Sequence, residues 1–111
     1  MITSLRNQLP NVAELCRRYS VCRLELFGSA TSEQTFDPDS SDLDLVVAFD
    51  PGLNLGPWLR HYFEFRDALQ ALFGRSVDLV MHSAIKDGFF RRELDRTRRV
   101  LYASEDAEVA R

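Results

Sequence analysis

The strongest constraint on this chain is a pair of aspartates that open an apolar run, Asp42-Leu43-Asp44-Leu45-Val46-Val47-Ala48-Phe49. The run is rich in strand-forming residues and is closed by the turn sequence Asp50-Pro51-Gly52, so it predicts a strand over residues 42–49. Because side chains two apart in a strand share a face, Asp42 and Asp44 lie together while the apolar residues between and after them face the core. Adjacent carboxylates repel and raise each other's pKa, which is costly unless a cation bridges them.

Charge is unevenly distributed along the chain. Residues 24–59 contain seven Asp and Glu residues and no Lys or Arg, within a chain of 111 residues and net charge −3. A folded stretch of this kind needs positive charge nearby, and a divalent metal is one candidate. The alternative is a solvated acidic loop, which accounts for Asp37 and Asp39 but not for Asp42 and Asp44. The mild net acidity argues against direct binding of nucleic acid.

A third aspartate stands in another apolar segment, Val77-Asp78-Leu79-Val80-Met81, which predicts a third strand. A carboxylate has no packing reason to be there. If this strand lies beside the strand of residues 42–49, Asp78 joins Asp42 and Asp44. Three carboxylates could then hold two Mg²⁺ ions for an in-line displacement at phosphorus, and one could accept the proton of the attacking hydroxyl.

A Gly-Ser pair, Gly28-Ser29, follows the predicted first strand at residues 22–27. A strand that ends in Gly-Ser leaves backbone N–H groups free, and glycine lets a phosphate approach closely. The serine hydroxyl adds a donor. The pair becomes specific only in combination with the Asp-x-Asp strand and Asp78, from which it is separated by a polar stretch, residues 30–41, that predicts a loop.

The remaining pattern predicts helices that alternate with strands, and hence an α/β (α+β) fold with helices packed against one small sheet. No repeat, linker or low-complexity tract divides the chain, so residues 1–111 are interpreted as a single domain. The expected helices cover residues 3–8, 10–19, 55–73 and 84–97, and a short fourth strand covers residues 100–102.

Aromatic residues are concentrated in the predicted helix 55–73. We expect most of them in the core, but they outnumber the positions on one helix face, so part of the set is expected to face a partner. These aromatic residues are Trp58, Tyr62, Phe63, Phe65 and Phe73.

Features of secreted and membrane proteins are missing from the sequence. No apolar run approaches the roughly 20 residues of a membrane span, and no secretory signal is visible. Cys16 and Cys22, the two cysteines, fit no zinc pattern and are expected to be reduced apolar side chains. We therefore expect a cytoplasmic protein.

The order of these features resembles a known family. Gly28-Ser29, an acidic loop, Ser41-Asp42-Leu43-Asp44-Leu45, a helix and Val77-Asp78-Leu79 look like the polymerase-beta-type nucleotidyltransferase superfamily. The size and the closing stretch, residues 85–94 to 100–102, are similar to its minimal nucleotidyltransferase (MNT) branch, which is often encoded beside a HEPN-domain protein. The resemblance extends over about residues 10–103 and implies the polymerase-beta-like nucleotidyltransferase fold, with a small mixed sheet.

The resemblance also implies a reaction. In it, Gly28 and Ser29 bind the nucleoside triphosphate, Asp42 and Asp44 bind Mg²⁺, and Asp78 helps to bind the catalytic metal and activates the acceptor hydroxyl. A nucleoside monophosphate, commonly AMP from ATP, moves onto that hydroxyl and pyrophosphate leaves. In the branch paired with HEPN toxins the acceptor is a tyrosine of the toxin, and the nucleotidyltransferase is the antitoxin.

The chain departs from the family in residues 30–34, which contain neither the basic residue nor the glycine that usually follow Gly-Ser. Neutralisation of the triphosphate must then come from metal or from arginines elsewhere, such as Arg75 or those of residues 91–99. The departure leaves open an alternative, a non-catalytic module that inhibits a HEPN partner by contact alone. A nucleic-acid-directed transferase would need further domains. A chain this small is expected to complete its site with a partner or a second copy of itself.

Overall fold

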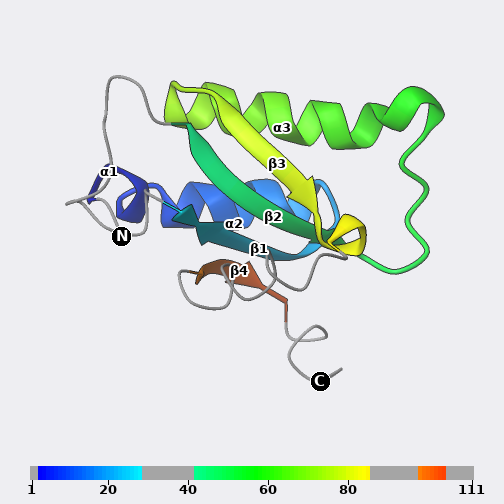
Figure 1. The fold of residues 1–111 in the computed structure, drawn as a ribbon, viewed down its shortest axis with the longest axis horizontal. Helices are drawn as coiled ribbons and strands as arrows, with labels where there is room; N and C mark the ends of the chain where they lie inside the picture. Colours follow the sequence, from blue (N-terminus) through cyan, green and yellow to red (C-terminus); the bar gives the residue numbers. More distant parts are fainter. Residues whose placement is uncertain (1–2, 29–41, 86–97, 105–111) are drawn as a thin grey trace.

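The computed structural model describes residues 3–28, 42–85 and 98–104, which form one four-stranded sheet and its helices (Figure 1). The strand order is β3-β2-β1-β4. β1 pairs antiparallel with β2 and β4, whereas β2 and β3 are parallel, so the sheet is mixed, as expected. The elements in chain order are α1 (Thr3–Arg6), α2 (Leu9–Arg18), β1 (Val21–Phe27), β2 (Leu43–Phe49), the 3₁₀-helix η2 (Pro57–Leu59), α3 (Arg60–Phe73), β3 (Val77–Met81), the 3₁₀-helix η3 (His82–Ala84) and β4 (Arg99–Ala103).

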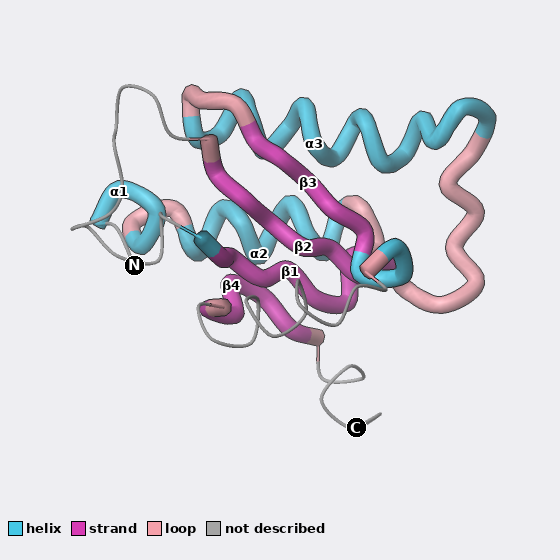
Figure 2. The backbone as a smooth tube through the Cα atoms, in the orientation of Figure 1, coloured by secondary structure: helices cyan, strands magenta, loops and turns pink. Residues whose placement is uncertain are grey.

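Helices α2 and α3 cover one face of the sheet (Figures 1 and 2). The side chains of Leu43, Leu45 and Val47 are at most 1% exposed and pack in one cluster with residues of both helices. This confirms the alternation expected for the second strand, with apolar residues toward the core. The helical members of the cluster include Val12, Cys16, Phe65 and Leu69.

The opposite face of the sheet carries the aspartates, and we call it the carboxylate face. It has a small apolar cluster of its own, in which Val46 and Ile85 are buried and Phe27 and Val80 are partly buried. Apolar side chains therefore lie next to Asp44 on the carboxylate face.

Two ends of the helices follow the expected sequence signals, and two others differ from expectation. α2 begins with Pro10 in its first turn, where the missing N–H is not needed, and α3 ends at Gly74 in the left-handed conformation. The expected helix 55–73 starts only at Arg60, because Trp58 and Leu59 adopt positive φ angles of 58° and 55°. The helix expected over residues 3–8 already ends at Arg6.

Three of the five aromatic residues of this region lie in the core or pack against it. Phe65 is fully buried, and Tyr62 and Phe73 pack against the core. Trp58 is 94% exposed and Phe63 is 40% exposed, so most of the set lies in the core and part of it faces outward, as expected. The reasons are geometric: Trp58 precedes the regular helix, and Phe63 lies about 200° around the helix from Phe65.

The four strands confirm the expected strands to within one or two residues. The loop expected over residues 30–41 and most of the helix expected over residues 84–97 lie outside the described residues. Of that helix, only Ala84 and Ile85 are described, and Ala84 is the last residue of η3. No helix in the described ranges is long and apolar enough to cross a membrane.

Candidate active site

The parallel pairing of β2 and β3 places Asp44 directly beside Asp78. Each aspartate is flanked along its strand by buried residues: Leu43 and Leu45 for the first, Val77 and Leu79 for the second. Because those neighbours face the helices, both carboxylates project from the carboxylate face. The expectation that the third strand lies beside the second is confirmed, and with it the proximity of two of the three predicted ligands.

Electrostatics links all three aspartates. The pKa of Asp44 is raised above its ordinary value of 3.8, first by partial burial of the carboxyl, then by the charges of Asp78 and Asp42. Asp42 is exposed and directly precedes β2. An acid with this environment resists ionisation, and a cation placed between the carboxylates would relieve the repulsion.

Gly28, at the end of β1, makes room for the Asp44 carboxylate. Its neighbour Phe27 pairs with Asp44 across the sheet, and Gly28 itself has a φ of +78°. A Cβ atom built on Gly28 would lie 2.8 Å from Oδ2 of Asp44, closer than real Cβ contacts allow. Gly28, the predicted phosphate-binding glycine, and Asp44, a predicted metal ligand, therefore lie directly against each other. Ser29 lies outside the described residues.

The donor set fits a hard divalent cation. Mg²⁺ prefers carboxylate oxygens and normally completes its shell with water and phosphate oxygens. In the described part of the chain, no three Asp, Glu, His or Cys side chains are grouped closely enough to hold a metal ion by themselves. Among the described residues, the structure thus pairs Asp44 with Asp78 but does not gather Asp42, Asp44 and Asp78 into one closed metal site.

One further acidic residue of this face was missed by the sequence analysis. Glu25 is 6% exposed and forms ion pairs with Arg23 and Arg98. Glu25 and Phe27 are two residues apart on β1, and this spacing predicts that both side chains lie on the same face of the sheet. The sequence contained no signal for Arg98 as its partner, because that contact depends on the pairing of β1 with β4.

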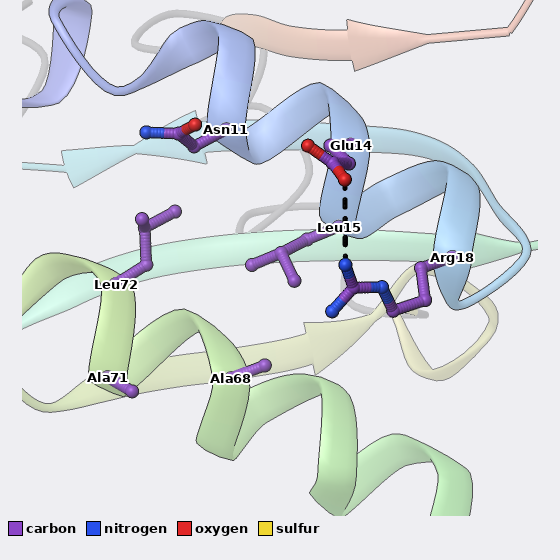
Figure 3. A pocket seen from close by; sticks show the side chains of 7 residues that line it. All are labelled: Asn11, Glu14, Leu15, Arg18, Ala68, Ala71 and Leu72. Atoms are coloured by element: carbon purple, nitrogen blue, oxygen red, sulfur yellow. Dashed lines mark ion pairs between the residues drawn. The ribbon is translucent and has the colours of Figure 1, made fainter.

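A groove between α2 and α3 lies on the other side of the sheet (Figure 3). It has a volume of about 390 Å³, with the ion pair between Glu14 and Arg18 at its rim. It contains none of the predicted site residues. Its lining residues are Asn11, Glu14, Leu15, Arg18, Ala68, Ala71 and Leu72.

Residues 12–102 match the family model described as "Nucleotidyltransferase domain". The chain belongs to this nucleotidyltransferase family. The match spans the Gly-Ser pair and all three aspartates, and the mixed sheet agrees with the fold that the resemblance implied.

Two similar proteins indicate which branch of the nucleotidyltransferase family this chain resembles. Protein adenylyltransferase MntA of Thermococcus cleftensis is 35% identical over 89 residues, which are 80% of this chain and 81% of the relative. A solved structure described as a candidate minimal nucleotidyltransferase is 30% identical, with a TM-score of 0.68, and covers 86% of this chain and 90% of its own.

A third solved structure contains an MNT antitoxin in complex with a tri-AMPylated HEPN toxin of Shewanella oneidensis. Its TM-score is 0.63 at 16% identity, over 96% of this chain and 78% of that one. At this identity the likeness shows that the nucleotidyltransferase shares the fold. The expected fold and enzyme class are confirmed.

Proposed function

We propose that this nucleotidyltransferase moves AMP from ATP onto a tyrosine hydroxyl of a HEPN-domain toxin, and thereby acts as its antitoxin. The proposal rests on one observation above all, the pairing of Asp44 with Asp78 beside Gly28. It is supported by the relative named as a protein adenylyltransferase and by the complex of an AMPylated HEPN toxin with an MNT antitoxin.

In the proposed site, Asp42, Asp44 and Asp78 hold two Mg²⁺ ions, and Gly28 and Ser29 bind the nucleotide. The bound metal would neutralise the triphosphate and polarise the phosphoryl oxygens. Asp78 accepts the proton of the attacking hydroxyl. The hydroxyl oxygen forms a bond to the α-phosphorus, the bond from that phosphorus to the bridging oxygen breaks, and pyrophosphate leaves.

The same proposal treats residues 1–111 as one minimal nucleotidyltransferase domain that acts in the cytoplasm. Cys16 and Cys22 are both free thiols in the structure, which agrees with a reducing compartment. A partner that brings its own tyrosine would complete a site for which this small sheet supplies only one side.

The proposal is tested by the intact mass of the partner. The chain is incubated with the HEPN-domain protein encoded beside it, with or without Mg²⁺, and with each nucleoside triphosphate in turn. We expect a mass gain of one or more AMP groups, with ATP and only when Mg²⁺ is present. Mapping of the modified peptide should place the group on a tyrosine.

Two outcomes would contradict the proposal. A mass gain on the chain itself, with none on the partner, would assign a different acceptor. No mass gain, together with a stable complex that silences the toxin, would favour the non-catalytic alternative.

A further inference from the structure

A buried acid on the carboxylate face is held between two arginines. The side chain of Glu25 is 7% exposed, and its Oε1 accepts a hydrogen bond of 2.9 Å from Nε of Arg23. Its Oε2 lies 3.2 Å from Nε of Arg98. The exposed fractions of the two arginine side chains are 15% and 45%, respectively. Arg98 is thus the partner that reaches solvent.

Two arginines lie against the single carboxylate of Glu25. One arginine suffices to neutralise a buried carboxylate, so Glu25 with Arg23 alone would form a neutral buried pair. Arg98 adds a positive charge to that pair. Oε2 of Glu25 accepts no hydrogen bond, so the contact between Glu25 and Arg98 is an ion pair only.

The sheet register places this positive charge near the aspartates. Arg98 directly precedes β4, whose first residue, Arg99, pairs with Leu26 of β1. Continued by one residue, the antiparallel register sets Arg98 beside Phe27, which on its other side pairs with Asp44. Neighbouring strands are about 4.8 Å apart, so Arg98 starts about two strand spacings from Asp44. Gly28 follows Phe27 directly.

We propose that Arg98, held in place by buried Glu25, contacts the phosphates of the nucleotide bound at Gly28. Residues 30–34 contain no Lys or Arg, so the usual source of positive charge after the Gly-Ser pair is missing. Arg98 supplies that charge from the other side of β1. Glu25 is then a positioning residue, which acts on the nucleotide only through Arg98. This inference rests on the proposed function, since it requires that a nucleotide binds at Gly28.

The test measures nucleotide binding and needs no transfer. Equilibrium dialysis of the full chain with Mg²⁺ compares a non-hydrolysable ATP analogue with AMP. Because a charge-assisted hydrogen bond contributes about 1.5–3 kcal/mol, we expect Arg98→Gln to weaken binding of the ATP analogue by about tenfold to a hundredfold. Binding of AMP should change much less. Arg98→Lys, which keeps the charge, should restore part of the affinity.

Arg17→Gln is the matched control, since Arg17 is also exposed but lies on α2, on the other side of the sheet. It should bind the ATP analogue as the wild type does. Glu25→Gln keeps the shape of the side chain but releases Arg98. In the transfer reaction it should raise KM for ATP several-fold with little change in kcat, while melting curves report any loss of folding.

The outcomes separate this inference from the proposed function. If wild type binds the ATP analogue and folded Arg98→Gln binds it equally well, the role of Arg98 is refuted while the proposed function stands. Equal weakening of ATP-analogue and AMP binding in Arg98→Gln would also refute it, because that pattern indicates general damage to the site. If wild type binds no nucleotide, both fail together.

Discussion

The carboxylate of Asp44, near the start of β2, fills the space that a side chain on Gly28, directly after β1, would need. The missing side chain of the glycine is what lets the carboxylate lie there, since a Cβ atom would come within 2.8 Å of Oδ2. In the proposed site, Gly28 therefore has a second role besides phosphate binding, because it also sets the position of Asp44, a proposed metal ligand.

Substitution of Gly28 should damage activity more than stability. Gly28→Ala forces the Asp44 carboxylate away, and a misplacement of about 1 Å can cost about a hundredfold in rate. The left-handed φ adds a loss of about 1 kcal/mol in free energy of unfolding. The control is Gly52→Ala, at a φ of +82° with nothing within 4 Å of its Cβ, which has the strain without the collision. Equal transfer rates for the two variants would disprove the positioning role.

The sequence predicted the carboxylate pair because two local patterns were enough. Period-two alternation gave the faces of β2 and β3, and the apolar flanks of Asp78 marked it as unusual. The pairing of the two strands was a conditional expectation, which the parallel register now fulfils.

Other features depended on long-range or backbone geometry. The start of α3 was misjudged because the left-handed conformations of Trp58 and Leu59 leave no trace in hydrophobic periodicity. The role of Glu25 was missed because Arg98 meets it only through the pairing of β1 with β4. Charge patterns within one segment could not reveal such a contact.

The outer edge of β3 is held by side chains of α3. The hydroxyl of Tyr62 donates a hydrogen bond to the carbonyl of Leu79, and the side-chain carbonyl of Gln70 accepts one of 3.1 Å from the N–H of Val77. These bonds occupy backbone groups that an edge strand would otherwise offer to another chain. Tyr62→Phe should therefore lower the free energy of unfolding by about 1 kcal/mol, measured by urea denaturation. An unchanged midpoint and slope would show that the bond contributes nothing.

The thiol of Cys16 should be inert in the folded chain. Burial raises its pKa to about 12, so the reactive thiolate is scarce at neutral pH. Iodoacetamide at pH 8 should label Cys16 only upon unfolding, and the intact mass reports the labelling. Rapid labelling of Cys16 in the native protein would contradict its burial.

The raised pKa of Cys16 also has a consequence for stability. The unfolded chain loses the thiol proton near pH 9 while the folded chain keeps it, so this group lowers stability as the pH rises above that value. The slope is at most about 1.4 kcal/mol per pH unit. Between pH 8 and 10, wild type should lose stability more steeply than Cys16→Ala. Parallel curves would contradict the shift.

The fluorescence of Trp58, the single tryptophan, measures how exposed this side chain is. Since 94% of it is accessible to solvent, its fluorescence in the folded chain should resemble that of a fully hydrated indole. Acrylamide should quench it about as well before as after denaturation. A blue-shifted, protected emission from the chain alone would place this side chain in an apolar environment and contradict the structure.

The central claim is that the Asp44–Asp78 pair performs nucleotidyl transfer to a HEPN-domain partner. The most direct measurement is the partner's intact mass after incubation with Mg²⁺, ATP and either Asp44→Asn or Asp67→Asn, each confirmed to be folded. Asp67 is an exposed aspartate of α3 and serves as the matched control. We predict AMP-sized mass gains with wild type and Asp67→Asn, and none with Asp44→Asn. Undiminished transfer by Asp44→Asn would contradict the account.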